Sequence, residues 1–168
     1  MAVSKQIIFE IISFHFRNKM KTFDYSKLKN VRGNTQTTEK IYIKIMRKIL
    51  ENLQLDFIEA ESQRPWDFRV FIDENTTLKI EMKKTQSKKV MLNDTLPKND
   101  VYFIIIYIGK KSKIICINGD EMLGLSRFWI NDFQKELCML KQKNKFYDGY
   151  ITTYARPNFS FSIKHLIN

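Results

Sequence analysis

Apolar residues recur at helical spacing along the first third of the chain. They occupy positions 8, 11, 12 and 15 or 16 in one segment, and 42, 45, 46, 49 and 53 in the next. Steps of three and four residues place such side chains on one face of a helix. Thr37 or Thr38 can cap the second segment. The pattern predicts two amphipathic helices, residues 5–20 and a second running to about residue 54, joined by a basic loop over residues 21–38.

The middle of the chain has the period of a strand instead. Residues 66–72 and 76–83 alternate between polar and apolar positions, with Asp73-Glu74-Asn75 as the turn between them. Residues 101–108 and 113–118 are apolar enough for a second, more deeply buried strand pair. The centre of the chain is therefore predicted to be a β-sheet.

A helix from about residue 121 to residue 143 and a weakly alternating tail over residues 150–163 complete the order. The resulting fold class is mixed α/β, with a central, mostly antiparallel or mixed sheet flanked by helices. At 168 residues we expect one domain. Its expected parts are a basic N-terminal helix and loop (1–38), a central helix and sheet (39–118), and a C-terminal helix with short strands (119–168).

The net charge of the chain is the strongest indication of the kind of partner that it binds. Lys and Arg number 29 against 18 Asp and Glu, for a net charge of +11. Such an excess favours a polyanionic partner, either nucleic acid or an acidic membrane surface. Cys116 and Cys138 have no metal-site spacing and lie among apolar residues, which predicts buried free thiols. No secretory signal and no membrane-spanning run is visible, so we expect a cytoplasmic protein without a membrane partner.

The two alternating segments place charged residues on one face. In the first segment Asp67 lies opposite the apolar face, and in the second Glu81 and Lys83 do. A slip of one residue would flip every side chain, so keeping the apolar faces together restricts the register. A three-residue turn then puts Asp67 directly across from Glu81, with Cβ atoms about 5 Å apart. The apolar positions kept together are Trp66, Phe68, Val70, Leu78, Ile80 and Met82.

Two carboxylates this close repel each other unless something compensates their charge. A Mg²⁺ ion bound through both supplies that compensation, lowers the pKa of a water and orients a phosphate. Lys83 could stabilise charge on the transition state or help deprotonate the water. The alternative is a solvent-facing strand on which Lys79, Arg69 and Glu81 form a structural charge mosaic.

Pro65-Trp66-Asp67, followed after thirteen residues by Glu81-Met82-Lys83, resembles the signature of the PD-(D/E)xK nucleases. The resemblance implies that Asp67 and Glu81 bind metal and that Lys83 assists catalysis. Trp66 departs from the pattern because it separates the Pro from the Asp. Family members often add a carboxylate from the preceding helix, and Glu39 has that place. Glu39 can equally be an acid favoured by the dipole at a helix N-terminus.

Within that superfamily the chain is similar to the short type II restriction endonucleases. The similar segments are residues 92–100 and Arg156-Pro157-Asn158-Phe159. This resemblance implies a homodimer that uses Mg²⁺, with Mn²⁺ able to substitute, to cut double-stranded DNA at a short specific sequence. It also implies a cognate DNA methyltransferase in the same system and a prokaryotic or viral intracellular setting.

Polar and basic residues around these motifs are the candidate DNA contacts. Lysines can hold phosphates while amides and hydroxyls read base edges, although a solvated lysine-rich loop is an equally open interpretation. The candidates are Arg32, Asn34, Lys84, Gln86, Ser87, Lys88, Lys89, Asn93, Arg156 and Asn158. Two other functions stay open: a structure-specific nuclease, such as a junction resolvase or repair enzyme, and a non-catalytic basic DNA-binding module.

Overall fold

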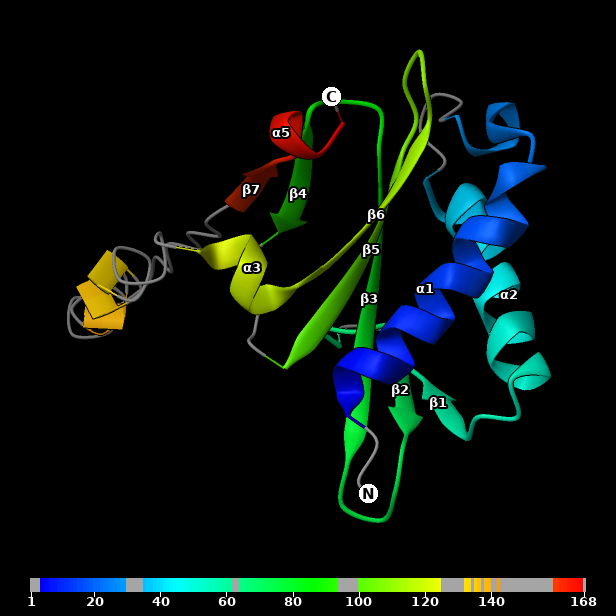
Figure 1. Cartoon of the computed structure of the whole chain (residues 1–168). Helices are drawn as coiled ribbons and strands as arrows, with labels where there is room; N and C mark the ends of the chain where they lie inside the picture. The colour runs from blue at the N-terminus through cyan, green and yellow to red at the C-terminus, as the bar shows by residue number, and fades with distance from the viewer. Residues whose placement is uncertain are drawn as a thin grey trace.

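A computed structural model describes the arrangement of most of the chain (Figure 1). The described residues are 4–29, 35–61, 64–93, 100–124 and 159–167, together with 132, 133, 135, 136, 138, 139 and 142.

Five strands form one sheet in the order β1-β2-β3-β5-β6. Neighbouring strands run antiparallel, except that β3 and β5 are parallel. The expected mixed α/β class and both expected strand pairs are confirmed. The strands are β1 (Phe57–Glu59), β2 (Phe68–Phe71), β3 (Thr77–Thr85), β5 (Val101–Tyr107) and β6 (Lys113–Asn118).

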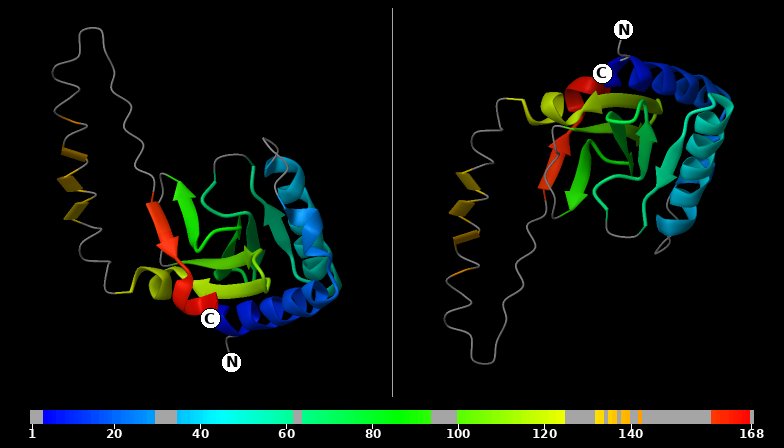
Figure 2. Two further views of the ribbon diagram at one scale, coloured as in Figure 1. Left: turned by 90° about the horizontal axis from the view of Figure 1, so that it is seen from above. Right: turned by 90° about the horizontal axis from the view of Figure 1, so that it is seen from below.

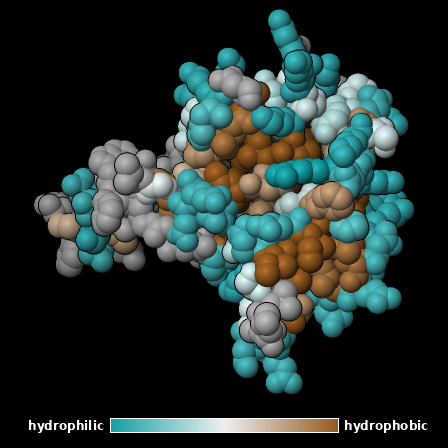
Figure 3. Space-filling model, viewed as in Figure 1, coloured by the Kyte–Doolittle hydropathy of each residue, from teal (hydrophilic) through white to brown (hydrophobic). Residues whose placement is uncertain are grey.

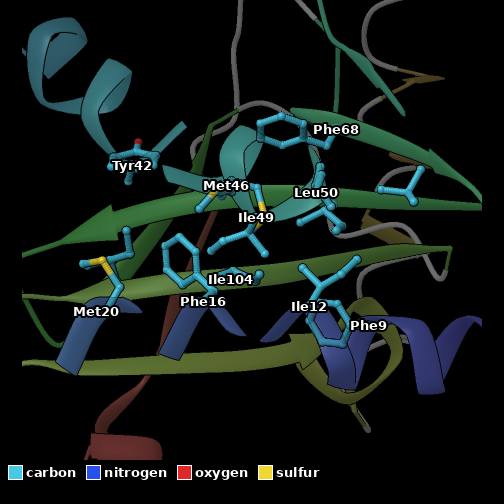
Figure 4. Close-up of a cluster of buried hydrophobic side chains, with 14 of the residues drawn as sticks. Phe9, Ile12, Phe16, Met20, Tyr42, Met46, Ile49, Leu50, Phe68 and Ile104 are labelled. Carbon is cyan, nitrogen blue, oxygen red and sulfur yellow. The ribbon is translucent and has the colours of Figure 1, made fainter. Parts of the chain in front are cut away.

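Two long helices cover one face of this sheet (Figure 2). They are α1 (Lys5–Lys21) and α2 (Thr35–Asn52), and a 3-10 helix η1 (Tyr25–Leu28) lies between them in the sequence. The expectation of two amphipathic helices is confirmed. Their inner side chains meet those of β2, β3 and β5 in one core (Figure 4). Fully buried members include Ile12, Phe16, Met46, Leu50, Phe68, Ile80 and Ile104.

The buried side of α1 includes Ile12 and Phe16, as expected, but is otherwise turned away from the expected one. Phe9, Ile12, Phe16 and Met20 are buried, whereas Ile11 is 41% exposed. The helix has apolar residues on more than one side, so periodicity alone did not decide which side meets the sheet. The side chosen supplies two phenylalanines, whose large rings bury the most apolar surface. The other side leaves an apolar patch over α1, formed by Ile7, Ile11 and Phe14 (Figure 3).

Shorter elements cover the opposite face. The strands β4 (Lys89–Asn93) and β7 (Phe159–Ser162) pair antiparallel, and short helices α3 (Gly119–Leu123) and α5 (Lys164–Ile167) lie with them (Figures 1 and 2). A second core forms there, which includes Val90, Phe103, Ile105, Ile117, Met122 and Ile163. The central sheet is therefore buried on both faces by different partners.

Three expectations about element bounds were wrong. The second helix was expected to follow a loop over residues 21–38 and a cap at Thr37 or Thr38, but α2 begins at Thr35. The basic stretch after the second strand was expected to be a loop, but β3 continues to Thr85 and β4 begins at Lys89. The helix expected over about residues 121–143 is interrupted: α3 ends at Leu123, and Gly124 adopts a φ of +48°, whereas the described residues between 132 and 142 are helical as expected. Glycine adopts this left-handed conformation at little cost, so it can end a helix there. Part of the expected helix, residues 125–131, lies outside the described residues.

The two cysteines are free thiols, as expected, but they are not both buried. Cys116 is half-buried and Cys138 is exposed. Burial raises the pKa of the Cys116 thiol. None of the helices in the described part of the chain combines the length and hydropathy needed to cross a bilayer.

Candidate active site

The β2–β3 hairpin has the register that the alternation predicted. Its pairs run from Phe71 opposite Thr77 to Phe68 opposite Ile80. At the turn, the Ile72 N–H donates to the Thr76 carbonyl at 2.9 Å, which leaves a three-residue connection. Asp67 precedes Phe68 and Glu81 follows Ile80, so these two acids are the next residues along the two strands.

Asp67 lies where the regular ladder ends. Its N–H donates to the Ile80 carbonyl at 2.8 Å, and its carboxylate Oδ2 accepts the Met82 N–H at 2.6 Å. The Asp67 side chain thus bonds a backbone N–H of β3 itself. A charge-assisted hydrogen bond of this length orients the carboxylate firmly.

Glu81 is the most enclosed acid of the hairpin, with 9% of its surface exposed. One oxygen, Oε1, lies 2.5 Å from the Lys83 ammonium. The other, Oε2, is buried and has no hydrogen-bond partner among the described residues. An unpartnered buried acceptor costs about 1–3 kcal/mol, and more when charged. A carboxylate oxygen in this state suits a cation as its partner, so Asp67 and Glu81 fit a divalent metal ion.

The pKa values of Asp67 and Glu81 are both raised, as expected for two buried acids that lie close together. Burial, and after it the charge of Glu81, raise the pKa of Asp67 to about 7, although the Met82 N–H and Lys83 lower it. Burial also raises the pKa of Glu81, while Lys83 opposes this. Without a cation the pair therefore resists full ionisation near neutral pH.

Helix α2 adds two residues to this environment. Glu39 is exposed near the start of α2, and its charge helps to raise the pKa of both Asp67 and Glu81. Tyr42, one turn later and buried, has its pKa raised by burial and by all three carboxylates. Sequence reasoning treated Tyr42 as core only; its position three residues after Glu39 is the signal that could have linked it to the site.

Within the described ranges, no set of three His, Cys, Asp or Glu side chains is grouped closely enough to hold a metal ion. The arrangement thus offers Asp67 and Glu81 as a ligand pair, and metal binding by Glu39 stays a prediction.

Among the described residues, Glu81 pairs with Lys83 and not with Lys79 or Arg69, the partners of the alternative charge mosaic. Lys79 pairs with Asp100 instead, an interaction that holds the pKa of Asp100 below its usual range. Arg69 donates to the Thr77 hydroxyl at 3.4 Å and lies 5.7 Å from the centre of the Phe71 ring. Lys83 is consequently the cation that accompanies Glu81.

Lys84 does not join the exposed lysines that were expected to contact DNA. Its ammonium donates to the Leu28 carbonyl at 2.9 Å and to the Thr38 hydroxyl at 2.5 Å. Lys84 pairs with Ile106 across the sheet, on the face covered by α1 and α2. The reason is alternation: Lys83 and Lys84 are neighbours, so they must point to opposite faces. Through these two hydrogen bonds, Lys84 links η1 and the start of α2 to β3.

The remaining candidate DNA contacts divide into two groups. Gln86, Lys88 and Lys89 are exposed at the bend between β3 and β4. The Ser87 hydroxyl is engaged within that bend, donating to the Lys89 carbonyl at 2.8 Å. Outside the described residues lie Arg32, Asn34, Arg156, Asn158 and the side chain of Asn93.

Comparison with known proteins adds no assignment. No known protein family matches this chain, and no curated protein matches it significantly.

Proposed function

We propose that this protein is a Mg²⁺-dependent endonuclease that hydrolyses phosphodiester bonds in double-stranded DNA. The observation that carries the proposal is the buried, unpartnered Glu81 oxygen beside the oriented Asp67 carboxylate, with the Lys83 ammonium 2.5 Å from the other Glu81 oxygen. The large majority of buried polar side-chain atoms have a hydrogen-bond partner, so an unpartnered carboxylate oxygen favours a role in binding a ligand.

Asp67 and Glu81 would hold the metal ion, with Glu39 in support. The bound metal supplies a nucleophilic water at neutral pH and charge stabilisation for in-line attack on the phosphate. Lys83 places a positive charge where negative charge develops on the phosphate oxygens. The Met82 N–H and Lys83 hold the two carboxylates in place, which limits the reorganisation needed when substrate binds.

The finer assignment is a sequence-specific restriction enzyme with a restriction-endonuclease-like core. Its support is the order of helix, acidic hairpin and further strand, with the site residues on the hairpin and at the start of α2. Such an enzyme would act as a homodimer, with one site per subunit for each DNA strand, and would need a cognate DNA methyltransferase. Net charge of +11 supports the polyanionic substrate.

The test is cleavage of plasmid and phage DNA by the purified protein with Mg²⁺ or Mn²⁺. We expect discrete fragments from the wild-type protein and none from Asp67→Asn, with duplex binding retained in both. Glu74→Gln is the matched control because Glu74 is an exposed acid in the turn of the same hairpin. Its cleavage should equal that of the wild type.

Unchanged cleavage by Asp67→Asn would remove the site from consideration. A smear, or cutting of branched DNA alone, would favour a structure-specific nuclease. Duplex binding without cleavage in either metal would favour the non-catalytic DNA-binding module.

A further inference from the structure

The turn between β5 and β6 carries a group of lysines that the site does not use. Lys110, Lys111 and Lys113 are exposed at this hairpin tip. The tip projects from one end of the molecule (Figure 1), and its surface there is hydrophilic (Figure 3). Lys110 and Lys111 form no ion pair with any other described residue.

Backbone pairing fixes this tip beside the end of β3. Thr85 pairs with Tyr107, and the Ile108 N–H donates to the Thr85 carbonyl at 2.9 Å. The exposed Lys88 and Lys89 follow directly after β3. The hairpin tip and the β3–β4 bend therefore share one end of the sheet.

This end of the sheet is unusually one-sided in charge. Five exposed lysines lie there, Lys88 and Lys89 at the bend and Lys110, Lys111 and Lys113 at the tip, and neither residues 83–93 nor residues 101–119 contain an Asp or Glu. Like charges gathered this way destabilise the folded chain through mutual repulsion. A bound polyanion relieves that repulsion, and release of its counterions adds to the affinity.

The spacing between tip and site matches a duplex. Lys83 pairs with Ile105, and Gly109 follows Ile105 by four positions, just beyond the end of β5. At roughly 3.3 Å for each residue, this is about 13 Å along the sheet. The major groove of B-form DNA is about 12 Å wide. A duplex with one phosphate at the site can therefore present a second backbone phosphate near the tip.

We propose that Lys110 and Lys111 form a second phosphate-binding contact, which grips the backbone of duplex DNA across a groove from the bond being cut. This inference rests on the proposed function. It adds the β5–β6 hairpin, which the sequence indicated only as a turn, to the substrate-binding surface. The contact is to the backbone, so it strengthens binding to specific and non-specific duplexes alike.

The experiment measures duplex binding by fluorescence anisotropy across a salt series, without Mg²⁺ so that no cleavage occurs. Each lost phosphate contact reduces the slope of log K against log salt by about 0.9. We expect Lys110→Ala/Lys111→Ala to reduce it by about 2 and to weaken binding about tenfold at low salt. Lys44→Ala/Lys48→Ala removes the same charge from exposed positions on α2 and should leave the slope unchanged.

Circular dichroism melting of both variants verifies folding, and Lys110→Gln/Lys111→Gln should repeat the effect with a longer side chain. An unchanged slope in the tip variants, or an equal loss in the α2 variant, would overturn the proposal. Preferential binding to anionic lipid vesicles would also overturn it, in favour of a membrane partner. A reduced slope in a protein that never cuts DNA would uphold the tip contact while rejecting the nuclease assignment.

Discussion

The two faces of strand β3 differ in what they bury and in what they offer to a ligand. One face carries Leu78, Ile80 and Met82 into the core under α1 and α2. The other carries Lys79, Glu81 and Lys83, on the side shared with Phe103 and Ile105. Adjacent residues therefore have opposite environments, as Lys83 and Lys84 show most directly.

The difference shows how a single strand can separate stability from chemistry. Apolar burial on one face holds the strand in its register. That register then brings Asp67 and Glu81 together on the hairpin, although their proximity costs free energy. The core face thus compensates for the strain of the acidic face, and we expect that each face can be disturbed without the other.

The largest expected effect comes from Glu81→Gln on the acidic face. If Glu81 holds the metal as proposed, loss of its charge should reduce cleavage about 100- to 1000-fold. The free energy of unfolding without metal should not fall, because the variant removes a buried charge that resists ionisation. Cleavage rates and urea unfolding of the same preparation measure both quantities. A variant that loses activity only by unfolding would contradict the separation of the two faces.

The opposite disturbance is Ile80→Ala on the core face. Ile80 is fully buried, and such a truncation costs about 3 kcal/mol of unfolding free energy. The protein that remains folded should keep its cleavage rate within a few-fold. Urea denaturation gives the first value, and rates corrected for the folded fraction give the second. Met91→Ala, at an exposed position of β4, is the control with little expected change.

A pH series tests the crowding of the acids. The pKa of Asp67 rises from 3.8 to about 7 on folding, so the folded chain binds more protons than the unfolded chain between these values. Metal-free stability should consequently fall as pH rises from about 4 to about 7, by up to about 4 kcal/mol. Thermal unfolding at each pH should show this fall in the wild type and a smaller one in Asp67→Asn. Mg²⁺ should restore stability mainly above pH 7, where the carboxylates ionise.

The smallest expected difference separates the two neighbouring lysines. Lys84→Met should lose about 1–2 kcal/mol of unfolding free energy, because the Leu28 carbonyl and Thr38 hydroxyl lose a charged donor. Lys83→Met should lose cleavage instead, with little change in stability. Comparing unfolding and cleavage in the two variants decides this. Equal losses of stability and cleavage in the two variants would show that the two faces of β3 do not have separate roles.

Much of the hairpin could be predicted from the sequence because the information is local. Alternation in two segments and a short turn limited the register, and the pairing of Phe68 with Ile80 follows it. The buried stripe of α2 and the pair β5–β6 also follow from periodicity, although α2 begins at Thr35, before the expected cap at Thr37 or Thr38. The buried stripe of α1 could not be predicted, because that helix has apolar residues on more than one side and only packing against the sheet selects among them.

The sequence by itself determined that Asp67, Glu81 and Lys83 share a hairpin, because a period of two leaves few registers. Only the tertiary structure decided how each charge is satisfied. Lys79 goes to Asp100, and Lys84 goes to Leu28 and Thr38. Those partners lie 21 to 56 residues away in the chain, and packing of separate elements brings them together. Local periodicity carries no information about such contacts, so the unpartnered oxygen of Glu81 became visible only in the folded chain.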